Sequence, residues 1–113
     1  MGHNSKSGEK FMSYLRVNLA KTDSKQGRDE ILERINNSAD TMFPDIEMML
    51  GIATGETSIM TVSIYADEEN ATKAIGQRNE HMKNNKTELE VAFEGELKAF
   101  FKKEIITVNP SIG

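Results

Sequence analysis

The chain of 113 residues contains no cysteine and no tryptophan, and it has only two tyrosines. The lack of cysteine excludes disulfides and thiolate metal sites. No apolar run approaches the roughly 20 residues of a membrane-spanning helix, and the first residues lack the apolar segment of a signal peptide. These absences predict a small cytoplasmic protein with a modest hydrophobic core.

The chain also lacks a block of charge of one sign. Eighteen acidic against fourteen basic residues give a net charge of −4. Nucleic-acid binding normally shows a clustered basic surface, so that class of function is disfavoured. No paired carboxylates, glycine-rich phosphate loop or metal-ligand spacing is present, and we therefore expect no metal and no cofactor.

What the chain does have is strict alternation in residues 58–66, SIMTVSIYA. Alternate positions carry Met60, Val62 and Ile64 on one side and Thr61, Ser63 and Tyr65 on the other. Residues 11–21 alternate in the same way, with Leu15, Val17 and Leu19 opposed to Tyr14, Arg16 and Asn18. This period of two predicts two strands, each with an apolar and a polar face.

Two helices are predicted between and after these strands. The first is capped by Ser24 or Asp23, carries an apolar stripe at helical spacing, and ends before Pro44, which disfavours helical backbone at the preceding residue. The second is capped by Asp67 with acids in its first turn, where the helix dipole favours them, and fades at residues 83–86.

Two further strands complete the pattern. Residues 46–53 are short and apolar and precede a turn-like group, which predicts a hairpin with 58–66; Gly51 within them indicates a bulge or a close approach by another backbone. Residues 89–101 fit both a helix and a strand. A glycine such as Gly95 destabilises the interior of a helix by about 1 kcal/mol, and phenylalanine and valine favour β-strands. A strand is therefore the preferred interpretation.

The element order βαββαβ predicts an α+β, ferredoxin-like domain over residues 11–104, with two helices on one face of a four-stranded antiparallel sheet. Residues 1–10 are interpreted as a leader, and 105–113 as a tail docked on the body or on a partner. The apolar positions 60, 62 and 64 are expected to face the helices. The polar face is then left open, and a second copy is expected to cover it, which gives a homodimer with a cavity in each half.

The stretch PDIEMMLGIATGETSIMTVSIYADEENA and the later VAFEGELKAFF resemble the dimeric α/β-barrel superfamily, which includes the antibiotic-biosynthesis-monooxygenase-like domains. The resemblance covers about residues 11–101 and implies pairing of two sheets into a barrel. Some members are cofactor-free monooxygenases of polycyclic aromatics, and some degrade haem. The resemblance makes Asn18 and His81 candidate catalytic residues, because an asparagine on the first strand and a histidine on the second helix act in such members.

The candidate ligand-binding residues are those of the polar faces: Tyr14, Arg16, Asn18, Thr61, Ser63 and Tyr65. An arginine can hold a carboxylate with two hydrogen bonds, and tyrosines can grip a flat ligand. A small organic acid or aromatic ligand is therefore expected. The alternative is that Arg16 pairs with Glu94 or Glu96 and only fixes the assembly. Arg78 is expected to extend its head into water, and His81 to lie at the solvent edge.

Three functions remain open from the sequence. The first is a homodimer that binds a small molecule in a polar and aromatic cavity without catalysis. The second is a cofactor-independent monooxygenase of the antibiotic-biosynthesis type, or a related isomerase-like enzyme. The third is a purely structural assembly dimer that holds no ligand.

Overall fold

The computed structural model describes residues 13–103, and its elements follow the predicted order. They are β1 (Tyr14–Lys21), α2 (Lys25–Met42), β2 (Ile46–Ala53), β3 (Ser58–Tyr65), α3 (Glu68–Asn84) and β4 (Glu88–Glu96). The four strands form one antiparallel sheet in the order β2-β3-β1-β4. The ferredoxin-like fold is confirmed, with β1 and β3 central; the predicted leader 1–10 and tail 105–113 lie outside the described residues.

Both helices begin at the predicted caps. The side chain of Ser24 accepts a hydrogen bond from the backbone N–H of Gly27 at 2.9 Å, and that of Asp67 accepts one from Asn70 at 2.9 Å. Each bond satisfies a donor that the first helical turn leaves free. The first helix ends at Met42, with Phe43 in extended conformation before Pro44, as the proline predicts.

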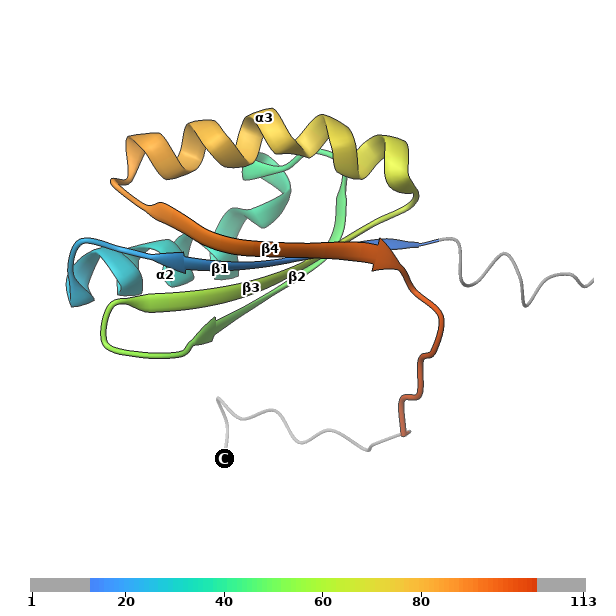
Figure 1. Cartoon of the computed structure of the whole chain (residues 1–113), viewed down its shortest axis with the longest axis horizontal. Coiled ribbons are helices and arrows are strands. Elements are labelled where there is room, and N and C mark those ends of the chain that lie inside the picture. The colour runs from blue at the N-terminus through green and yellow to red at the C-terminus, as the bar shows by residue number, and fades with distance from the viewer. Residues whose placement is uncertain (1–12, 104–113) are drawn as a thin grey trace, which may run out of the picture.

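The ambiguous stretch after α3 is a strand, as preferred from the sequence, but it is shorter than predicted. β4 ends at Glu96 rather than at Phe101, and the chain then descends away from the sheet (Figure 1). Glu96 pairs with Tyr14, the first residue of β1, and one more backbone bond joins Leu97 N to Ser13 O at 2.9 Å. β4 therefore stops opposite the residue at which its antiparallel neighbour β1 begins.

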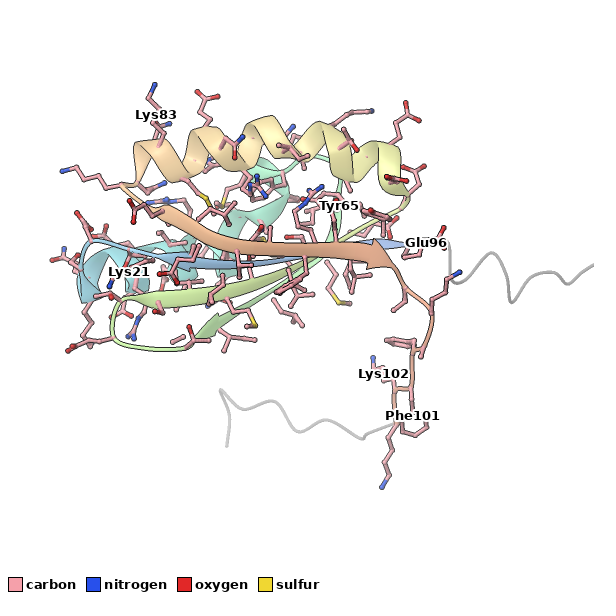
Figure 2. The ribbon with its side chains drawn as sticks, in the orientation of Figure 1. Lys21, Tyr65, Lys83, Glu96, Phe101 and Lys102 are labelled. Carbon is pink, nitrogen blue, oxygen red and sulfur yellow. The ribbon has the colours of Figure 1, made fainter. Side chains whose placement is uncertain are left out.

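The prediction of which sheet face the helices cover is wrong. Tyr65 and Arg16 are each only 2% exposed, and Ser63 is buried beside them, all on the side of α2 and α3. Figure 2 shows Tyr65 between the strands and α3. The side chains at 60, 62 and 64 point to the opposite face and are only partly buried. The polar face is thus under the helices, and the apolar face is the open one.

The open face is apolar on all four strands. It carries Leu15, Val17, Leu19, Met48, Leu50, Ile52, Met60, Val62, Ile64, Val91 and Phe93. Phe93 is 64% exposed and Met48 52%, and no described helix lies below β2 and β3 (Figure 1). Alternation separates the two faces of a strand, but it does not say which of them the helices of the same chain cover.

Close packing of α2 on β2 depends on Gly51. A Cβ atom at this position would lie 2.9 Å from Leu32 Cδ2 and 3.5 Å from Ile35 Cδ1, both on α2. The neighbours are side chains of α2 and not another backbone, so neither the bulge nor the backbone approach predicted at Gly51 is observed. The irregularity of β2 lies elsewhere, between Ile46 and Met48.

Candidate functional site

A cavity of about 70 Å³ lies between the helix-side face of the sheet and the two helices. The sheet contributes Arg16, Asn18, Ala20, Met49, Ile59, Thr61, Ser63 and Tyr65 to its lining. The helices and their ends contribute Ile31, Arg34, Ile35, Met42, Phe43, Arg78, His81, Met82, Asn85 and Thr87. The cavity is inside one protomer, so the prediction that a second copy encloses it is wrong.

Arg16 is the most constrained polar side chain of the cavity. Its Nη1 donates to the carbonyl oxygen of Ala71 on α3 at 2.7 Å, and its Nη2 donates to Glu94 Oε1 on β4 at 3.0 Å. The predicted alternative, pairing of Arg16 with an acid of the last strand, is thus observed with Glu94, while Glu96 pairs with Lys98. The Nε hydrogen of Arg16 is buried and has no acceptor among the described residues.

Asn18 connects the sheet to α3. Its Oδ1 accepts a hydrogen bond from Arg78 Nη1 at 3.2 Å, and its Nδ2 donates to Thr61 Oγ1 at 3.4 Å. The register explains the second contact, because Asn18 and Thr61 are opposite each other in the β1–β3 ladder and point to the same side. The buried amide is therefore held in one orientation by a guanidinium and a hydroxyl.

His81 joins α3 to the end of α2. Its Nε2 lies 3.0 Å from the carbonyl oxygen of Met42, and its ring meets that of Phe43 edge to face with centroids 5.3 Å apart. A carbonyl oxygen only accepts, so Nε2 carries the proton and Nδ1 is left as an acceptor in the neutral ring. Close by, Arg34 Nη1 donates to Asn85 Oδ1 at 3.0 Å, which is a second polar contact between the helices.

Burial changes the acidity of two groups in the cavity wall. Desolvation of the hydroxyl raises the pKa of Tyr65 above its usual 10.0. Desolvation, and secondarily the nearby positive charge of Arg16, lowers the pKa of Arg78. The positive charge of Arg16 thus acts on Arg78 in a partly buried site, and the carboxylate of Glu94 acts in the opposite direction.

Five of the six predicted ligand-binding residues line this one cavity: Arg16, Asn18, Thr61, Ser63 and Tyr65. Both catalytic candidates, Asn18 and His81, line it as well. Tyr14 does not; it packs against the apolar cluster that includes Phe43 and Tyr65. The periodicity of the strands therefore grouped the right side chains, although it placed them on the wrong side of the sheet.

The helical contributors Arg34, Arg78 and Asn85 were not predicted as site residues. Arg78 reaches Asn18 and does not extend fully into water, whereas His81 lines the cavity and is partly exposed, as predicted. A polar strand face covered by helices requires polar side chains on those helices, and this rule could have identified the three residues. It could not be applied as long as the polar face was expected to be open.

Within residues 13–103, no group of three or more histidine, aspartate and glutamate side chains is arranged to hold a metal ion. None of the helices in this part of the chain is long and apolar enough to cross a membrane.

Neither a family model nor a curated protein matches the sequence. Among solved structures, the fold is similar to SnoaB, a cofactor-independent oxygenase from Streptomyces nogalater, with a TM-score of 0.53 and 11% identity over 80% of this chain and 95% of that one. It is similar to a monooxygenase from Streptomyces coelicolor solved with nanaomycin D, with a TM-score of 0.54 and 9% identity over 91% and 99% of the two chains.

A third similar structure is a dimeric ferredoxin-like protein from an uncultured marine organism. Its TM-score is 0.52 and its identity 11%, over 81% of this chain and 94% of that one. These similarities agree with the ferredoxin-like fold, and identities this low concern the fold alone.

Proposed function

We propose that the protein binds a small organic molecule in the cavity between the sheet and the helices of each protomer. The observation that carries this proposal is the gathering of buried polar groups from β1 and β3, and partly buried ones from α3, around one partly enclosed space. A binding site of this kind combines an apolar wall with a few placed polar groups. Arg16, Asn18, Thr61, Ser63 and Tyr65 are the proposed ligand contacts.

The size of the cavity limits the ligand. One water molecule needs roughly 10–15 Å³ of cavity volume, so a cavity of about 70 Å³ has room for about six waters. A molecule of one or two rings therefore fits with small adjustments of the walls, whereas a larger one requires α2 and α3 to move apart.

The binding test is a panel of small aromatic acids, amides and phenols, screened by ligand-observed NMR. The variant Thr61→Met fills the cavity from the sheet side, and Thr72→Met, exposed on α3, is the matched control. Wild type and Thr72→Met are expected to bind the same members of the panel, and Thr61→Met to bind none. Equal binding by Thr61→Met would contradict the proposed location.

The proposed assembly is a homodimer formed through the open face. Four strands about 4.8 Å apart and eight residues long cover roughly 500 Å² in projection, which is at the upper end of exposed apolar patches on monomers. Two such faces together bury roughly 1,000 Å², the lower limit for a specific interface. One structural neighbour is described as a dimeric ferredoxin-like protein, which is consistent with such pairing.

Sedimentation equilibrium measures this assembly. The expected mass is twice the chain mass of 12.6 kDa at micromolar concentration. A mass of 12.6 kDa across the concentration range would refute the homodimer and would leave the cavity, which is within one protomer, unaffected.

A second candidate function is a cofactor-independent monooxygenase. It is favoured by the position of Asn18 and His81 in the cavity wall and by the names of two structural neighbours. Oxygen consumption with a panel of aromatic quinols tests it, with Asn18→Ala as the variant expected to lose activity. Binding of the quinols without oxygen uptake would exclude this function for them and retain the first.

The assembly dimer without a ligand is favoured only by the Arg16–Glu94 pair, since that contact ties β1 to β4 without any ligand. This third candidate predicts that no member of the binding panel contacts the cavity, while the homodimer forms normally.

A further inference from the structure

The cavity concentrates positive charge in a chain whose net charge is −4. Three of the four arginines of the sequence, Arg16, Arg34 and Arg78, belong to its lining, and the described lining contains no aspartate or glutamate. Within residues 13–103, only Arg16 among these three forms an ion pair, and its partner Glu94 is 42% exposed. The residues that line the cavity therefore carry positive charge and no carboxylate.

One donor of Arg16, its Nε hydrogen, lacks an acceptor among the described residues, and this atom marks where an anionic group can bind. Two of its nitrogens are bonded to Ala71 and Glu94, whereas the Nε hydrogen has no acceptor in the described chain and is closed off from solvent. A buried donor without an acceptor destabilises a protein, and more so when the group is charged. Because bulk water does not reach this atom, only a molecule inside the protein can satisfy it.

Arg78 provides a second cation on the opposite wall. It approaches from α3; its Nη1 donates to Asn18 Oδ1 at 3.2 Å in the cavity wall, and its Nε donates to Asn79 Oδ1 at 3.2 Å on the exposed side. Burial lowers its pKa and the charge of Arg16 adds to this effect, while Glu94, the half-exposed partner of Arg16, offsets it only in part. An anion between them removes both the repulsion and the desolvation penalty.

Most of the remaining exposed wall is apolar and includes Ile35, Met42, Phe43 and Ile59. An inorganic anion would satisfy the arginines but leave this wall against water. A flat or compact hydrocarbon body attached to a single anionic group satisfies both parts.

We infer that the ligand of this cavity is a small organic carboxylate, whose oxygens bind Arg16 and Arg78 and whose apolar body packs against the Phe43 side of the cavity. The inference rests on the proposed binding function and adds the chemical class of the ligand. The closest arrangement of donors is at β1 and α3, so the carboxylate lies toward the Arg16–Asn18–Arg78 group.

The test uses isothermal titration calorimetry with two matched pairs, benzoate against benzamide and 2-naphthoate against 2-naphthamide. The members of each pair have similar shape and differ in charge. The acids are expected to bind about 10- to 100-fold more tightly than the amides, the range of a charge-assisted hydrogen bond. Backbone NMR shifts at residues 16, 18 and 71 check that the acids bind in the cavity.

Variants identify the cation. Arg78→Met is expected to weaken the acids about 10- to 100-fold and to leave the amides unchanged, because it removes one charged donor. Arg78→Lys keeps the charge but loses the planar fork, and an intermediate affinity is expected. Lys83→Met removes a positive charge from the outer side of α3 and is expected to change nothing (Figure 2). Circular dichroism checks that each variant is folded.

Three results would overturn the inference. Amides that bind as tightly as the acids, with the same NMR shifts, would show a neutral site and leave the proposed function in place. Inorganic phosphate that binds as tightly as benzoate would show that the site recognises charge alone. Failure of both acids and amides would also reject the carboxylate class, and the broader panel then decides the binding function separately.

Discussion

The two faces of the sheet differ in a way that reverses the usual expectation. The face under the helices carries arginine, asparagine and hydroxyl side chains, and the face without helices carries valine, leucine and phenylalanine. The polar face is buried because its groups bond to each other and to α3, as Arg16 and Asn18 do. Burial of polar groups is tolerated when they are hydrogen-bonded, so polarity alone does not mark the solvent side of a strand.

The two faces also suit two different roles. The helix-side face surrounds a cavity within one protomer, which suits recognition of a small molecule. The open face is apolar and uncovered in the described chain, which suits association with a second copy. Changes on one face are therefore expected to leave the role of the other intact.

The largest expected effect is on the open face. Val62→Glu introduces a carboxylate at the centre of the proposed interface and is expected to raise the dimer dissociation constant at least about 100-fold, because an unpaired buried charge costs several kcal/mol. Sedimentation equilibrium measures it, with the exposed Thr72→Glu on α3 as a control of equal charge. An unchanged mass for Val62→Glu would remove the open face from the assembly.

The next effect is on the helix-side face. Arg16→Met leaves the carbonyl of Ala71 and the carboxylate of Glu94 without their donor, and it is expected to lower the free energy of unfolding by about 1–3 kcal/mol. Urea denaturation at fixed protein concentration measures the change. Lys98→Met breaks the exposed pair with Glu96 and is expected to cost about 0–1 kcal/mol. Equal losses would argue against a special role of the buried pair.

A smaller change in stability is expected where α2 packs on β2. Gly51→Ala places a methyl group 2.9 Å from Leu32 Cδ2 and is expected to lower stability by about 1 kcal/mol, at the low end for overpacking because the leucine end can shift. Gly76→Ala, on α3 with open space around the new Cβ, is expected to raise stability by about 0.5–1 kcal/mol. Thermal unfolding measures both. A gain in stability from Gly51→Ala would contradict close packing of α2 on β2.

The smallest effect is a pH dependence of Tyr65. Burial raises its pKa above 10.0, so the unfolded chain releases this proton at lower pH than the folded chain does. The stability contribution is fully present below pH 10.0 and is lost as the pH rises through the folded-state pKa. Tyr65→Phe is expected to flatten this alkaline decline. Tyr14→Phe is expected to flatten it less, because Tyr14 is less buried. Urea midpoints at several pH values above 9 measure the two slopes.

The sequence by itself determined the order of the elements and the limits of most of them. Ser24 and Asp67 cap their helices, Pro44 ends the first helix, and residues 54–57 form the hairpin turn, because these signals act between neighbours in the chain. Alternation also determined which side chains share a face, so Arg16, Asn18, Thr61 and Ser63 were grouped correctly.

Only the tertiary structure decided which face of the sheet the helices cover and where the site is. A strand alternates identically whether its apolar side meets its own helices or a partner, so the choice depends on contacts between distant segments. Arg16 bonds to Ala71, and Arg78 bonds to Asn18, each across more than 50 residues of sequence. Such bonds make a buried polar face stable, and no local pattern in the chain encodes them.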